Sequence, residues 1–133
     1  MYRVIREINF SYGHRLINYE GKCAHLHGHN AKVQIELSSD KLTHQGMVMD
    51  FFEIKQKLGE WINQEIDHKL LLSEDDALVE MLRKAGEPVI TMKDNPTAEA
   101  IAKMIFEQAR HLRLPVSRVT LWETPNSAAV YHE

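Results

Sequence analysis

Three histidines lie within five residues of one another in the segment Cys23-Ala24-His25-Leu26-His27-Gly28-His29. Residues two apart in an extended chain point to the same side, so two of these imidazoles can bind one ion. His14 lies just past the end of an expected strand, and it supplies a third imidazole if that strand pairs antiparallel with the strand that follows His29. Three neutral histidines with one open position are typical of a catalytic zinc site. The spacing leaves open which of the three clustered histidines bind, and loop histidines without a metal are the alternative.

Cys23 is the only cysteine of the chain, which excludes an internal disulfide. It could be a fourth metal ligand that closes a structural site. It could instead be a thiolate base activated by a nearby metal and imidazole, or a small buried apolar side chain. A lone thiol beside several histidines also fits a reducing cytoplasm.

Two further places in the sequence carry groups for acid–base or binding chemistry. Asp67 and His68 follow an expected helix, and a carboxylate beside an imidazole can orient the ring and hold its proton. The alternative is a solvated helix end. Glu123 shares the parity of Val119 and Leu121 in a late strand, where a carboxylate needs a partner. A ligand with two adjacent N–H groups could supply two parallel hydrogen bonds, and a strand-end salt bridge is the alternative.

Strands are expected wherever apolar and polar residues alternate. Residues 2–12 place Val4, Ile8 and Phe10 on one face, and residues 31–38 alternate over their whole length. Turn residues fill 40–46. Further extended segments are expected over residues 47–49, 88–92, 117–123 and 127–132, the last two joined by a Thr-Pro-Asn-Ser turn.

Two long helices and one short helix separate these strands. Asp50 can cap the first helix, and Glu53 stands three residues later, as in a capping box. The second begins near Asn95-Pro96-Thr97, with Asn95 or Thr97 as its cap, and it ends before Pro115. A short helix is expected over residues 74–86. The apolar stripes at helical spacing are Phe51, Ile54, Leu58, Trp61 and Ile62 in the first helix, and Ala98, Ile101, Ala102, Ile105 and Ala109 in the second.

The grouping of strands and helices predicts an α+β fold, with an antiparallel sheet and two long helices packed on one face. We expect one domain over residues 1–133, because no linker, repeat or low-complexity tract interrupts the chain. The opposite sheet face is polar and aromatic, as a face that meets another subunit often is. It carries Lys32, Gln34, Glu36, Thr120 and Trp122.

The composition excludes several classes of protein. Of the 133 residues, 44% are hydrophobic and 26% are charged, as in ordinary globular proteins. The formal net charge of −3 speaks against a nucleic-acid partner. No apolar run approaches the roughly 20 residues that span a membrane, and no signal peptide is expected at the start. We therefore expect a cytoplasmic protein without a membrane partner.

The sequence resembles the family of 6-pyruvoyl-tetrahydropterin synthase and 6-carboxy-5,6,7,8-tetrahydropterin synthase along nearly its whole length. Six motifs occur in the family's order, and together they are highly specific. They are Phe10-Ser-Tyr-Gly-His14-Arg-Leu, Cys23-x-x-x-His27-Gly28-His29-Asn30, Val48-Met-Asp50-Phe51, Asp67-His68, Asn95-Pro96-Thr97-Ala98-Glu99 and Trp122-Glu123-Thr124.

The resemblance implies a T-fold, or tunnelling fold, in which sheets of several subunits close into a barrel. It implies a homohexamer of two trimers with active sites between subunits. It assigns Zn²⁺ to His14, His27 and His29, and the catalytic base to Cys23. Asp67 and His68 become the partners of that base, from a neighbouring chain. Glu123 becomes the anchor of the pterin ring, and Thr97 matches a pterin-contacting position.

The reaction implied is that of a zinc-dependent lyase of queuosine biosynthesis. It converts 7,8-dihydroneopterin triphosphate to 6-carboxy-5,6,7,8-tetrahydropterin, acetaldehyde and triphosphate, and the three-residue gap between Cys23 and His27 resembles this branch. The alternatives are 6-pyruvoyl-tetrahydropterin formation without side-chain cleavage, and a non-catalytic zinc-stabilised module that binds pterins. Arg15 and Lys22 are candidates for the triphosphate. The chain departs from the family at Ala31, where an aromatic residue often stands.

Overall fold

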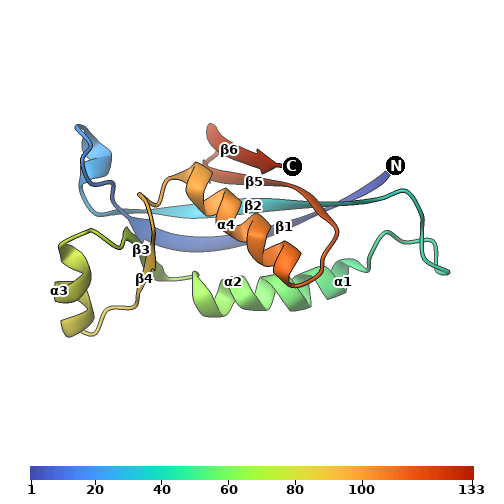
Figure 1. The fold of residues 1–133 in the computed structure, drawn as a ribbon, viewed down its shortest axis with the longest axis horizontal. Coiled ribbons are helices and arrows are strands. Elements are labelled where there is room, and N and C mark those ends of the chain that lie inside the picture. Colours follow the sequence, from blue (N-terminus) through green and yellow to red (C-terminus); the bar gives the residue numbers. More distant parts are fainter.

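In the computed structural model, which describes residues 1–133, six strands form one sheet and the helices pack on one of its faces (Figure 1). The strands are β1 (Tyr2–His14), β2 (His27–Ser39), β3 (Lys69–Ser73), β4 (Val89–Met92), β5 (Val116–Thr124) and β6 (Ser127–His132). The helices are α1 (Phe51–Ile54), α2 (Glu60–Glu65), α3 (Leu78–Lys84) and α4 (Ala98–His111). A π-helical segment, Lys55–Gly59, joins α1 to α2, and a 3-10 turn covers Lys22–Ala24. The expected α+β class is confirmed.

The sheet is mixed rather than purely antiparallel, with the strand order β4-β3-β1-β2-β5-β6. Strands β1, β2, β5 and β6 are antiparallel neighbours, as expected. Strand β3 runs parallel to β1 along Tyr12–His14, and β4 runs parallel to β3. The sequence analysis missed β3, because a short apolar run such as Lys69–Ser73 has no period that separates a buried strand from a buried helix. Residues 47–49 lie in the loop before α1 and form no strand.

The pairing of β1 with β2 brings the histidines together. His14 lies opposite His27, and Tyr12 lies opposite His29. Both strands run further than expected, so the histidines are inside the sheet rather than in the loops beside it. Cross-strand partners in an antiparallel pair share a face. The expected meeting of His14 with the later histidines is therefore confirmed.

Two helical segments begin at a side-chain cap: the continuous run of α1, the π-helical segment and α2, and helix α4. Asp50 accepts a hydrogen bond from the Phe52 N–H at 2.8 Å, as expected. Glu53 does not complete the capping box, because its carboxylate pairs with Lys57 at 2.8 Å. At α4 the cap is Thr97, whose hydroxyl accepts from the Ala100 N–H at 3.1 Å. Asn95, the other candidate for this cap, instead forms side-chain hydrogen bonds with the backbone of Ile17.

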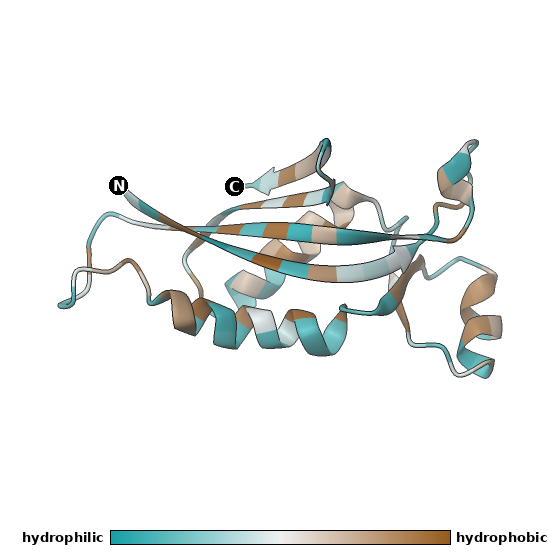
Figure 2. Ribbon diagram, turned by 180° about the vertical axis from the view of Figure 1, so that it is seen from behind, coloured by the Kyte–Doolittle hydropathy of each residue, from teal (hydrophilic) through white to brown (hydrophobic).

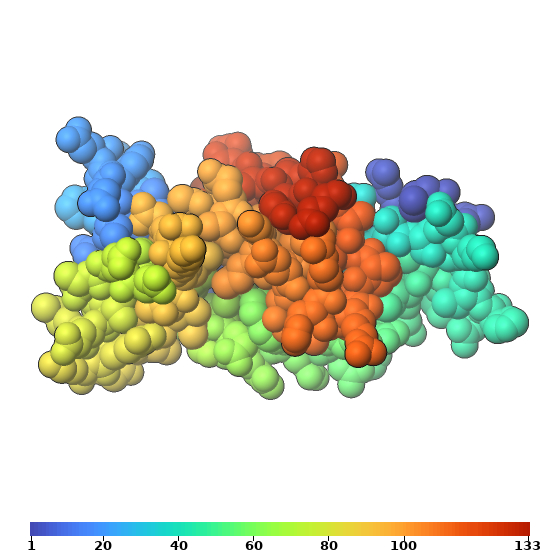
Figure 3. All heavy atoms as spheres, in the orientation of Figure 1, coloured from blue at the N-terminus to red at the C-terminus, as the bar shows by residue number.

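The core lies between the sheet and the helices, and it contains the alternate apolar residues of the strands (Figure 2). The α4 stripe is buried as expected, with Phe106 added to it. The loop between β1 and β2 and the loop before α1 project at opposite ends of the molecule (Figure 3). None of the helices has the length and apolar character needed to cross a membrane.

Candidate metal centre

The three histidines His14, His27 and His29 form a compact cluster at one end of the β1–β2 pair. One ring nitrogen from each lies within 4.8 Å of the others, and the Nε2 atoms of His14 and His29 are 3.1 Å apart. His14 is buried, whereas the other two imidazoles are half-buried and reachable from solvent. These three residues could hold a metal ion. His25 is exposed and stands outside the cluster.

Backbone carbonyls orient two of the three rings. His14 Nδ1 lies 2.7 Å from the carbonyl oxygen of Pro96, and His27 Nδ1 lies 2.7 Å from that of His25. A carbonyl only accepts, so each Nδ1 carries the proton and each Nε2 keeps a free lone pair. Burial lowers the pKa of His14, which favours the neutral form that a metal ligand requires.

Glu123 faces this cluster from β5. Its Oε2 atom lies 2.6 Å from His29 Nε2 and 3.6 Å from His14 Nε2. A carboxylate on the apolar face of a strand was expected to have a partner. For Glu123 that partner is the histidine cluster rather than a lysine or arginine at the strand end. Its side chain is 21% exposed, so a ligand can still reach it.

Tyr12 is a site residue that the sequence analysis missed. Its side chain is 3% exposed, and its ring packs edge-on against His14 with centroids 5.0 Å apart. Its hydroxyl is buried without a hydrogen-bond partner. Burial, followed by the negative charge of Glu123, raises the pKa of Tyr12 well above its usual value. The sequence did contain a signal for this placement, because residues 12 and 14 are two apart in one strand and therefore share a face.

Cys23 lies in the 3-10 turn between β1 and β2, half-buried and free. Its carbonyl accepts a hydrogen bond from the Leu16 N–H at 2.8 Å, which closes the base of this loop. The candidate ligand group consists of the three histidines without the thiol. The structure thus gives no support to Cys23 as a fourth ligand.

Asp67 and His68 form a pair at the outer edge of β1. Asp67 Oδ2 lies 2.9 Å from His68 Nδ1, and Asp67 Oδ1 accepts from the Ser11 N–H at 2.8 Å. Burial works to raise the pKa of Asp67, but the hydrogen bonds from Ser11 and His68 outweigh it and hold this pKa below its usual value. The His68 side chain is 80% exposed, and no hydrogen bond or ion pair joins it to Cys23.

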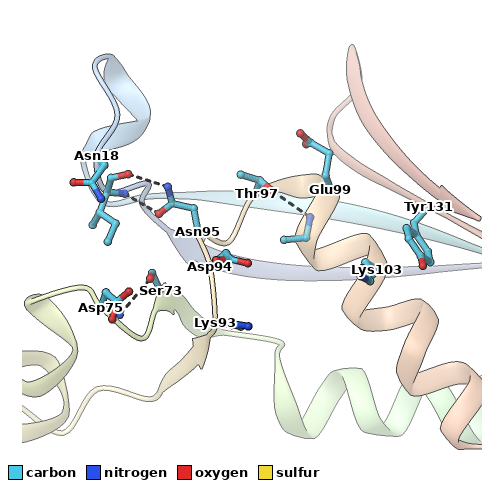
Figure 4. Close-up of a pocket in the computed structure, with 12 residues that line it drawn as sticks. Asn18, Ser73, Asp75, Lys93, Asp94, Asn95, Thr97, Glu99, Lys103 and Tyr131 are labelled. Carbon is cyan, nitrogen blue, oxygen red and sulfur yellow. Dashed lines mark hydrogen bonds between the residues drawn. The ribbon is translucent and has the colours of Figure 1, made fainter.

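Two contacts fix the segment that follows His14. The Asn95 amide accepts from the Ile17 N–H at 2.9 Å and donates to the Ile17 carbonyl at 2.8 Å (Figure 4). Arg15 donates from Nε and Nη2 to the buried Asp76 carboxylate at 2.8 and 2.5 Å. Arg15 is therefore committed to an internal ion pair, and it is not the free phosphate ligand that its position suggested.

Thr97 lines a polar pocket beside the start of α4 (Figure 4). The pocket is bordered by Asn95 and the Ile17 segment that it binds, by residues at or after the ends of β3 and β4, and by the first turns of α4. Its charged residues are Asp75, Lys93, Asp94, Glu99 and Lys103. This mixture of signs makes the pocket polar without making it strongly attractive to an anion.

Comparisons with known proteins agree with this arrangement. The sequence model of the 6-pyruvoyl tetrahydropterin synthase family matches residues 3–133. Two proteins named 6-carboxy-5,6,7,8-tetrahydropterin synthase are similar to this chain. That of Rickettsia felis is 35% identical over 95% of this chain and 96% of its own. That of Haemophilus influenzae is 32% identical over the full length of both chains.

Solved structures show the same fold. An uncharacterized protein from Wolinella succinogenes superposes with a TM-score of 0.81 at 25% identity, covering 99% of this chain and 98% of that one. The 6-pyruvoyl tetrahydropterin synthase of Caenorhabditis elegans superposes with a TM-score of 0.74 at 24% identity, covering 99% and 95%.

Proposed function

This chain belongs to the 6-pyruvoyl tetrahydropterin synthase family, and from that premise we propose that it is a 6-carboxy-5,6,7,8-tetrahydropterin synthase. The reaction converts 7,8-dihydroneopterin triphosphate to 6-carboxy-5,6,7,8-tetrahydropterin, acetaldehyde and triphosphate. The observation that carries the proposal is the cluster of His14, His27 and His29 with Glu123 at its open side. The names and near full-length coverage of the relatives support this branch.

The resident metal in this proposal is zinc. Three imidazole nitrogens favour zinc over magnesium or calcium, which prefer oxygen ligands. Bound zinc would supply Lewis-acid polarisation of the hydroxyl oxygens on the substrate side chain. The carbonyls of Pro96 and His25 hold two of the rings in the tautomer that such binding requires.

Glu123 would anchor the pterin ring. A carboxylate can accept two parallel hydrogen bonds from the 2-amino group and the N3–H edge of a pterin. Because Glu123 lies against the histidine cluster, a ring held there would extend its side chain toward the metal. Thr97 would contribute a pterin contact, which is supported by its place directly after Pro96, whose carbonyl oxygen lies 2.7 Å from His14 Nδ1.

Cys23 would act as the base that moves a proton from the substrate side chain, with His68 as the second acid–base group. Asp67 would hold the His68 ring through its bond to Nδ1. Within one chain no hydrogen bond or ion pair joins this pair to Cys23, although His68 lines one pocket with His27 and His29. We place His68 in the site of a neighbouring subunit, as the family resemblance implies. An imidazole that is 80% exposed is free to enter such a site.

The sheet supports assembly into a barrel. Strand β3 covers β1 only along Tyr12–His14, so the outer edge of β1 before Tyr12 carries no strand. An unpaired edge of this length is a template for another strand. We propose a homohexamer of two trimers, with the polar sheet face toward the inside of the barrel. The free thiol supports a cytoplasmic location.

The alternatives are 6-pyruvoyl-tetrahydropterin formation and a non-catalytic pterin-binding module. The deciding experiment incubates the zinc-loaded protein with 7,8-dihydroneopterin triphosphate and identifies the products by mass spectrometry, with Cys23→Ala in parallel. We expect 6-carboxytetrahydropterin and acetaldehyde from the wild type alone. Pyruvoyl product without acetaldehyde would move the protein to the other branch. No turnover by a folded, zinc-filled wild type would reject the lyase function for this substrate.

A further inference from the structure

The hydroxyl of Tyr12 is a buried donor without a partner at the metal centre. Tyr12 is 3% exposed, and its ring lies against His14 and His29 with centroids 5.0 and 5.6 Å away. A buried hydroxyl that is not hydrogen-bonded destabilises a protein. Such a group calls for an acceptor close by.

The strand register shows which acceptor lies in reach. Tyr12 is opposite His29, and the next row on the same face pairs Phe10 with Ala31. Lys32 pairs with Trp122, and continuing this antiparallel register by one residue sets Ala31 opposite Glu123. Ala31 carries only a methyl group and is fully packed, so the Tyr12 ring can extend across it toward the Glu123 carboxylate. Both groups lie against His29: its ring centroid is 5.6 Å from that of Tyr12, and its Nε2 atom is 2.6 Å from Glu123 Oε2.

The histidines cannot be the lasting donors to this carboxylate. An imidazole nitrogen that binds a metal has no proton to donate, and His29 Nε2 is the atom that faces Glu123. A tyrosine side chain brings its own O–H donor. We propose that Tyr12 is a positioning residue whose hydroxyl donates a hydrogen bond to Glu123 and fixes its oxygens for the N–H edge of the ligand. This inference rests on the proposed pterin site.

The test removes only the hydroxyl, with Tyr12→Phe. Binding of 7,8-dihydroneopterin triphosphate is measured by calorimetry in the zinc-loaded Cys23→Ala protein, where turnover does not interfere. We expect Tyr12→Phe to weaken binding about ten-fold or more, the usual effect of losing a hydrogen bond to a charged group. Zinc content and thermal midpoint should stay near those of the parent. Tyr2→Phe, which alters an exposed tyrosine, should leave binding unchanged.

A double-mutant cycle with Glu123→Gln separates positioning from direct contact. If Tyr12 acts through the carboxylate, Tyr12→Phe should have little further effect in the Glu123→Gln background. Unchanged binding by Tyr12→Phe, or full additivity of the two changes, would overturn the proposal. A crystal structure of the zinc-loaded protein decides even if this pterin does not bind: the proposal requires Tyr12 Oη within about 3 Å of a Glu123 oxygen, and a longer separation rejects it.

Discussion

Arg15 and Asp76 form a two-pronged ion pair that ties the end of β1 to the start of α3. The guanidinium Nε and Nη2 atoms lie 2.8 and 2.5 Å from the two carboxylate oxygens, and the Asp76 side chain has no exposed surface. Asp76 also accepts from the Leu78 N–H at 2.8 Å. Since Arg15 directly follows His14, this pair fixes the backbone beside a residue of the histidine cluster.

Arg15→Ala should destabilise the protein strongly, because it leaves the Asp76 charge buried without its partner. We expect the free energy of unfolding to fall by about 3 kcal/mol, measured by urea denaturation. Lys84→Ala removes the exposed Lys84–Glu80 pair and serves as the matched control, with little expected change. Equal effects of the two substitutions would show that the buried pair has no special role.

The same pair predicts a dependence of stability on pH. The hydrogen bonds from Arg15 outweigh burial and hold the pKa of Asp76 below its usual value. A carboxyl whose folded-state pKa is lowered stabilises the protein above its unfolded value of about 3.9, and this stabilisation is lost as the pH falls through the folded-state pKa. Unfolding measured from about pH 7 to pH 2 should show this loss in the wild type. Asp76→Asn should show a shallower acid dependence, and an identical profile would contradict the assignment.

Much of this site could be predicted from local patterns. The alternation of β1 and β2 placed His14 beside the later histidines, and the parity of Glu123 indicated that its carboxylate needed a partner. These predictions succeed because strand parity depends on neighbouring residues, and because consecutive strands β1 and β2 pair antiparallel as expected.

Other features depend on contacts between distant segments. Strand β3 is a strand because Tyr12–His14 and β4 lie beside it, and its short apolar sequence shows neither contact. The choice between Asn95 and Thr97 as the cap of α4 depended on Ile17, which engages the Asn95 amide from 78 positions away. Arg15 looked free for the same reason, because its partner Asp76 is 61 positions away.

The histidine cluster predicts different results for His29, a member of the cluster in β2, and for His25, which lies outside it. His29→Ala should lower zinc stoichiometry and remove the stabilisation that bound metal gives, because only two cluster ligands remain. His25→Ala should leave both unchanged, because its side chain lies outside the cluster and the carbonyl that orients His27 is retained. Metal analysis and thermal melting with and without a chelator test this. Loss of zinc in His25→Ala would contradict the ligand assignment.

The proposed site, with Cys23 from one subunit and His68 from its neighbour, predicts complementation between inactive subunits. Cys23→Ala and His68→Ala should each be inactive and fold normally, since His68 is exposed and Cys23 makes no side-chain bond. If each site takes Cys23 from one subunit and His68 from its neighbour, random mixing of equal amounts in a symmetric oligomer should restore about a quarter of the sites. The measurement is turnover after the two variants are unfolded and refolded together, with each variant refolded alone as the control. Sites built within one chain would stay inactive in the mixture, because every chain lacks one of the two groups.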